Sequence, residues 1–164
     1  MKVRRILFYV FLTLAVAVNV LIIVESCIGG DGSAAQSFSF SEAIANFIES
    51  IFPDSIKDHA AFHSVIRKLI GHFLLFGLSG LFTTLTFVMN DFLMEKLKWK
   101  NVIIILLFGL VLALVSELIQ YFVPGRYGVL TDALIDYSGY IIFSGIVYLT
   151  YTLIVLKNQK SKEN

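Results

Sequence analysis

The sequence has little of what stabilises a folded domain in water. It contains one cysteine, Cys27, which excludes an internal disulfide bond and a Cys-rich metal cluster. Charged residues make up 15% of the chain and hydrophobic residues 57%, whereas soluble domains average about 25% and about 45–50%. The net charge of +1 gives no basis for nucleic-acid binding, because contact with phosphates needs a concentrated basic surface. These deficits exclude an ordinary water-soluble globule and indicate a membrane protein.

Four apolar stretches approach the length of about 20 residues that a helix needs to cross a bilayer. They cover about residues 6–24, 69–89, 102–122 and 133–156. The first follows a basic start, as a secretory signal does, but its 19 apolar residues exceed the ~7–15 of such a signal. We therefore expect a retained anchor and an all-α polytopic membrane protein, with residues 1–164 forming one domain of four transmembrane helices.

The basic residues are concentrated on one side of this arrangement. Four spans place both termini on the same side as the connection 90–101, and that side carries nine of the 13 basic residues: Lys2, Arg4, Arg5, Lys96, Lys98, Lys100, Lys157, Lys160 and Lys162. Lys and Arg are enriched in cytoplasmic segments. The distribution predicts cytoplasmic termini and an outer loop at 25–68.

The outer loop contains signals for a flexible segment and for one short helix. The run 29–33 is rich in glycine, which favours a flexible loop. Ser39 and Glu42 then have capping-box spacing, and apolar residues follow at helical spacing until Pro53. We predict an amphipathic helix over about 42–52, lying on the outer leaflet or packed against the spans.

Small and polar residues within the spans indicate contacts between helices. Helices in lipid associate through close packing and polar contacts, and the glycines at 77, 80, 109 and 139 would permit such packing. Asn19 is a lone polar residue in the first span, and we expect it to form an interhelical hydrogen bond.

Ionisable residues also lie near the outer ends of three spans. Such groups are costly in a membrane and usually face the protein interior. With a rise of about 1.5 Å per residue, they fall in one shallow layer, and spacings of three or four residues place each set on one helical face. We predict a single cluster with three cations and three carboxylates, formed by Arg67, Lys68, His72, Glu117, Gln120, Arg126, Asp132 and Asp136.

The same residues carry a resemblance to a known family. The ordered pattern Arg67-Lys68-x3-His72-Phe73, Glu117-x2-Gln120-x3-Pro124-Gly125-Arg126 and Asp132-x3-Asp136-x2-Gly139 resembles the VanZ-like family of bacterial membrane proteins. This resemblance implies a multi-pass protein of the bacterial cytoplasmic membrane, in a family whose named members are associated with resistance to teicoplanin-type glycopeptides. It supplies no settled reaction. Asp136 departs from the family pattern, which more usually has Asn there.

The chemistry of the cluster leaves three functions open. Arg and Lys side chains favour a phosphate or carboxylate, so the first is binding or handling of an anionic, amphiphilic envelope component: a membrane lipid, a lipid-linked cell-wall precursor or a glycopeptide. The second is an intramembrane hydrolase or transferase, with His72, Glu117 and Asp132 as candidate catalytic residues and no convincing nucleophile. The third is a structural or partner-binding subunit.

We expect neither a metal nor a cofactor. His59 and His63 have the spacing of paired zinc ligands, but no HExxH motif is present, and we interpret them as surface histidines. The sequence leaves the oligomeric state open.

Overall fold

The computed structural model describes residues 2–94 and 99–163, which form helices and connecting turns with no strands. Four stretches of these described residues are helical, long and apolar enough to cross a membrane, which confirms the predicted all-α, multi-pass class. The long helices are α1 (Lys2–Cys27), α4 (Leu75–Met94), α5 (Trp99–Phe122) and α6 (Leu130–Glu163). The short segments α3 (His59–Ile66) and η1 (Arg67–Leu74) lead directly into α4, so the second apolar stretch covers His59–Asp91.

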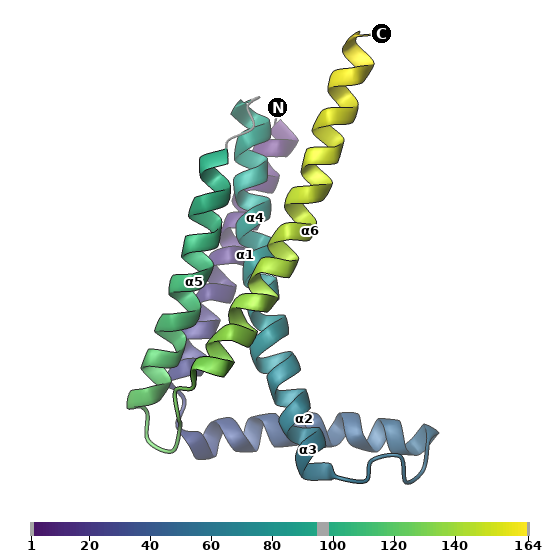
Figure 1. Cartoon of the computed structure of the whole chain (residues 1–164), viewed down its shortest axis with the longest axis vertical. Helices are drawn as coiled ribbons and strands as arrows, with labels where there is room; N and C mark the ends of the chain where they lie inside the picture. Colours follow the sequence, from purple (N-terminus) through teal and green to yellow (C-terminus); the bar gives the residue numbers. More distant parts are fainter. Residues whose placement is uncertain (1, 95–98, 164) are drawn as a thin grey trace.

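The four long helices lie side by side, with both chain ends at one end of the bundle (Figure 1). α4 ends and α5 begins at this same end, as the four-span arrangement requires. The helix α2 (Gly30–Ile51) lies crosswise at the opposite end. We call the two ends of the bundle the terminal end and the α2 end.

α4 occupies the centre of the bundle, where it packs mainly against α1 and α6. A Cβ atom added at Gly80 would lie 2.4 Å from the backbone oxygen of Tyr140 in α6, so the close approach of the two helices requires glycine. Gly109 in α5 faces the ring of the same tyrosine. The hydroxyl of Ser79 donates to Asn19 Oδ1 at 2.5 Å, which confirms the predicted interhelical bond between α1 and α4.

α2 differs from the expected outer loop. It begins at Gly30 rather than near residue 42, so the glycine-rich run is its first turn and not a flexible loop. The capping-box prediction is also wrong, because Ser39 lies inside the helix and its hydroxyl donates to Ala35 O at 3.0 Å. Ser41 makes the same kind of bond to Ser37 O at 2.8 Å. These serine hydroxyls thus donate to backbone carbonyls of the preceding helical turn. The sequence favours a turn or a helix cap instead, because serine commonly bonds to the backbone at such positions.

The apolar face predicted for α2 is only partly covered. Ile44 and Ile48 of this face are half-buried, but Phe47, Ile51 and Phe52 are each more than half exposed. These three side chains are therefore not packed against the spans, which leaves the membrane-surface alternative for this part of the face.

The two histidines considered as zinc ligands instead join α3 to α2. His63 Nδ1 lies 2.6 Å from Ser41 Oγ, and its Nε2 lies 3.3 Å from Glu42 Oε2. His59 Nε2 lies 3.4 Å from Glu49 Oε1. The side chain of His59 is 50% exposed but that of His63 only 16%, so the surface interpretation holds for His59 alone.

Candidate functional site

Three basic side chains of the predicted cluster come from η1, which is a π-helical segment. It carries Arg67, Lys68 and His72 and lies directly before α4. π-Helical turns inside α-helices occur often at functional sites, because the wider turn redirects the side chains that follow.

Two polar contacts connect η1 to the first turns of α6. Lys68 Nζ donates to Asp132 Oδ1 at 2.9 Å, and His72 Nδ1 lies 3.0 Å from Asp136 Oδ1. The side chains of the first pair are 39% and 15% exposed, whereas those of the second are 12% and 0% exposed. Lys68–Asp132 is therefore a partly solvated pair, and His72–Asp136, one helical turn further along both helices, is a buried pair.

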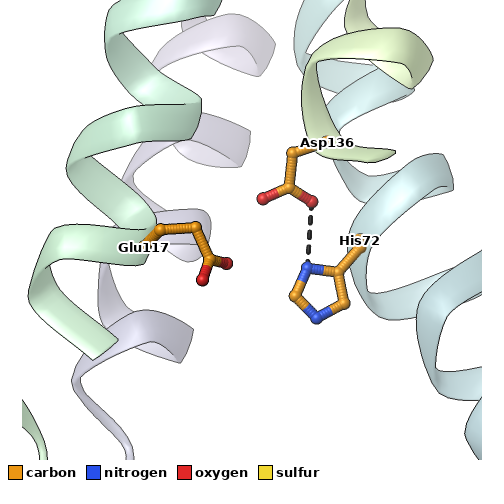
Figure 2. A group of neighbouring side chains, drawn as sticks. All are labelled: His72, Glu117 and Asp136. Atoms are coloured by element: carbon orange, nitrogen blue, oxygen red, sulfur yellow. Dashed lines mark hydrogen bonds and ion pairs between the residues drawn. The ribbon is translucent and has the colours of Figure 1, made fainter. Parts of the chain in front are cut away.

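α5 adds a carboxylate and an amide to the cluster. Glu117 Oε2 accepts the backbone N–H of Val129 at 2.8 Å, just before α6 begins, and its Oε1 accepts the amide of Gln120 at 3.2 Å. Glu117 points toward the place where His72 meets Asp136 (Figure 2). One possible ligand atom from each of these three residues lies within 4.8 Å of the others. Two carboxylates and an imidazole from three helices thus meet in the interior.

Arg126 lies between α5 and α6 and connects them to the corner of α1 and α2. Its Nη2 donates to Gln120 Oε1 at 2.6 Å, while Nη1 donates to Glu25 O at 3.0 Å and Ser33 Oγ at 3.1 Å. Burial lowers the pKa of Arg126 from its ordinary value, and Arg67 acts in the same direction, whereas Glu117 and Glu25 oppose the shift. Arg126 still carries its positive charge, and its hydrogen bonds connect Gln120 of α5 to Glu25 of α1 and Ser33 of α2.

A cavity of about 480 Å³ lies beside this cluster at the α2 end. Its apolar lining includes Leu21, Ile22, Phe40, Ile66, Ile70, Leu75 and Phe76, and its polar lining includes Glu25, Ser26, Ser33, Ser37, Arg67, His72, Ser116, Gln120, Arg126 and Asp132. Small-molecule sites commonly have this combination of apolar walls and a few polar groups.

The structure brings the predicted residues together but pairs them differently from the expected balance of three cations and three carboxylates. Among the described residues, Lys68–Asp132 is the one Lys or Arg ion pair in the cluster. Arg126 bonds to an amide, a hydroxyl and backbone oxygens rather than to a carboxylate. Arg67 is exposed and lines the cavity.

Sequence reasoning missed the wall of the cavity formed by α1 and α2. Ser26 Oγ lies 2.8 Å from Ser116 Oγ, and both side chains are buried. On α2, the cavity is lined by positions 30, 33, 37 and 40, which follow a helical period. This helical period of positions 30, 33, 37 and 40 could have indicated a helix from Gly30 onward. The glycine-rich run at 29–33 favoured a loop instead.

Comparison with known proteins supports a family assignment. The family model described as VanZ/LLP1 matches residues 8–153, which is most of the chain. No curated protein and no solved structure matches.

Proposed function

We propose a function for this chain, which belongs to the VanZ/LLP1 family and has four helices that can span a membrane. It binds the anionic headgroup of an amphiphilic envelope component in the cavity at the α2 end. The observation that carries this proposal is that Arg67, Arg126 and several apolar side chains line the same cavity. A guanidinium group makes forked contacts to phosphate and carboxylate. The apolar side chains suit the hydrocarbon part of the same molecule.

The two arginines have different parts in this proposal. Arg126 already donates to Gln120, Glu25 and Ser33, so it contributes mainly positive charge. Arg67 is exposed, and no hydrogen bond or ion pair to another described residue holds its guanidinium. Arg67 is therefore the group that would contact the headgroup directly.

We further propose that the protein lies in the bacterial cytoplasmic membrane with its terminal end in the cytoplasm. The concentration of Lys and Arg at that end supports this orientation, and the cavity would then face the envelope. Cys27, the single cysteine, is exposed at the α2 end and provides a test. A membrane-impermeant maleimide should label Cys27 in intact cells, and should label a Cys27→Ser, Ser161→Cys variant only after lysis. The reverse pattern would contradict the orientation.

Photo-crosslinking tests headgroup binding. The probe is a diazirine-labelled phosphatidic acid in nanodiscs, compared with the matching diacylglycerol, which lacks the phosphate. Arg67→Gln should reduce phosphate-dependent labelling at least about fivefold, since a hydrogen bond to a charged group contributes about 1.5–3 kcal/mol and this one would be partly solvated. Lys57→Gln is the matched control, because Lys57 is exposed and does not line the cavity. Equal labelling of the wild type and both variants would contradict the proposal.

We also propose that headgroup binding by this protein contributes to glycopeptide tolerance of the cell. Cells that lack the gene should become more sensitive to teicoplanin, and the wild-type chain should restore tolerance more fully than Arg67→Gln at equal abundance. Equal sensitivity of all these strains would remove tolerance from the function while leaving headgroup binding to the crosslinking test.

An intramembrane hydrolase or transferase is the second candidate, favoured by the His72–Asp136 contact. A carboxylate at Nδ1 orients an imidazole and leaves Nε2 for acid–base chemistry. Asp132 is less suited to this part than expected, because it pairs with Lys68. Proteoliposomes containing phosphatidic acid and polyprenyl phosphate would be analysed by mass spectrometry. Enzyme-dependent products that disappear with His72→Gln are expected, and product formation unchanged by that variant would exclude the histidine mechanism.

A further inference from the structure

We propose that His72, Glu117 and Asp136 bind one divalent transition-metal cation, with Zn²⁺ and Mn²⁺ as the candidates. This site does not depend on what the cavity binds, and it departs from the expectation of no metal. One donor atom from each residue lies within 4.8 Å of the others, so short side-chain movements would bring all three to one ion. One imidazole and two carboxylates match the ligand preferences of Zn²⁺ and Mn²⁺ better than those of Ca²⁺ or Mg²⁺.

The charges in the interior call for a compensating cation. Glu117 and Asp136 are 6% and 0% exposed, and neither receives a hydrogen bond from a lysine or arginine in the described part of the chain. Lys68 is paired with Asp132. Two buried carboxylates close together repel strongly, and a divalent cation with a neutral imidazole would bring this group to zero net charge.

Asp136 also has an oxygen without a partner. Its Oδ1 contacts His72, whereas Oδ2 is fully buried and makes no hydrogen bond among the described residues. Figure 2 shows that this second oxygen lies on the side that faces Glu117. An unpartnered buried carboxylate oxygen is costly, and coordination of a cation would satisfy it.

The contact between His72 and Asp136 has the separation of two ligands on one ion. Bonds of about 2.1 Å place neighbouring ligands about 3.0 Å apart in an octahedron and about 3.4 Å apart in a tetrahedron. Nδ1 and Oδ1 are 3.0 Å apart. The pair can thus be held by a proton, or by a shared cation that also binds Oδ2 of the same carboxylate. Infrared spectroscopy of the metal-loaded protein distinguishes these states.

The surroundings of Glu117 would hold its carboxylate in place as a ligand. Ionised carboxyl groups accept about four hydrogen bonds or coordination bonds. The two bonds from Gln120 and Val129 therefore leave room for a cation, and Gln120 is itself held by Arg126. Hydrogen bonds of this kind orient the ligands of most protein metal sites. Because His72 and Gln120 line the cavity, an ion could enter from there.

Metal analysis of the full chain in nanodiscs tests the site. The protein is produced without a polyhistidine tag and with His59→Gln and His63→Gln, so that no other histidine competes for the ion. It is stripped with chelator, loaded with Zn²⁺ or Mn²⁺, gel-filtered and analysed by mass spectrometry. About one ion per chain is expected, together with an X-ray absorption spectrum showing one imidazole and oxygen neighbours. Asp136→Asn and His72→Gln should each weaken binding at least about tenfold.

Asp132→Asn is the matched control, because Asp132 lies one turn before Asp136 on α6 and pairs with Lys68 instead. It should retain the ion. The inference is overturned if the folded parent chain retains neither metal, or if Asp136→Asn and Asp132→Asn retain it equally. It is also overturned if infrared spectroscopy of the metal-loaded protein shows a protonated carboxylic acid that Asp136→Asn removes. Loss of headgroup crosslinking with the metal retained would refute only the proposed function, and the opposite result only the metal site.

Discussion

Removal of the Arg126 side chain should loosen the corner at which α1, α2, α5 and α6 meet. Its guanidinium makes three contacts of 3.1 Å or less, to Gln120, Glu25 and Ser33. Hydrogen bonds to a charged group contribute about 1.5–3 kcal/mol each. Water in the cavity would satisfy some of the abandoned acceptors, so Arg126→Ala should lower the free energy of unfolding by a total of about 2–4 kcal/mol.

A lysine at this position should restore only part of the loss. Arg126→Lys keeps the charge, but one ammonium nitrogen cannot replace two guanidinium nitrogens that reach Gln120 on one side and Glu25 on the other. About half of the stability should return. Arg67→Ala is the control: the side chain is exposed, and its removal should change stability by less than about 0.5 kcal/mol.

Reversible unfolding in mixed micelles, followed by circular dichroism, measures these differences. Limited proteolysis near Gly29 gives a second, local readout, because a loosened corner should be cut faster while the spans stay protected. Equal stability of Arg126→Ala and Arg67→Ala, with unchanged proteolysis, would refute the bracing role.

Three further predictions follow from contacts elsewhere in the bundle. Gly139→Ala should destabilise the fold by about 1–3 kcal/mol, because its Cβ would lie 2.1 Å from Phe73 O, whereas Gly145→Ala on the same helix has no atom within 4 Å and should be neutral in thermal unfolding. A double-mutant cycle of Lys68→Met and Asp132→Asn should give a coupling of only about 0.5–1 kcal/mol, since Lys68 is 39% exposed; a coupling above about 3 kcal/mol would show a buried pair. Ser26→Ala should cost about 0.5–1.5 kcal/mol in the same unfolding assay, because it leaves Ser116 Oγ without its partner at 2.8 Å, and Ser116→Ala in that background should add little.

The membrane class and the depth of the polar cluster follow from the order of residues along the chain. Length and apolarity decide whether a helix can cross a bilayer, so the spans can be recognised without knowledge of their neighbours. The depth of a side chain such as His72 or Glu117 follows from its distance along the helix. Glycines at 80 and 109 likewise marked where helices approach closely.

Which charged groups meet depends on how the helices pack against one another. Lys68 and His72, like Asp132 and Asp136, are four residues apart, so the sequence allows either register between the two helices. The close contact of Gly139 with the backbone of Phe73 sets that register and places His72 against Asp136.

The crosswise path of α2 was equally beyond the reach of local sequence. Its glycine-rich first turn has weak helical propensity, yet Gly30 N–H donates to Pro124 O at 3.0 Å, and Arg126 bonds to Ser33. These partners lie about ninety residues away along the chain. Contacts made only after the bundle forms therefore stabilise a helix where the sequence alone favours a loop, and they complete the wall of the cavity.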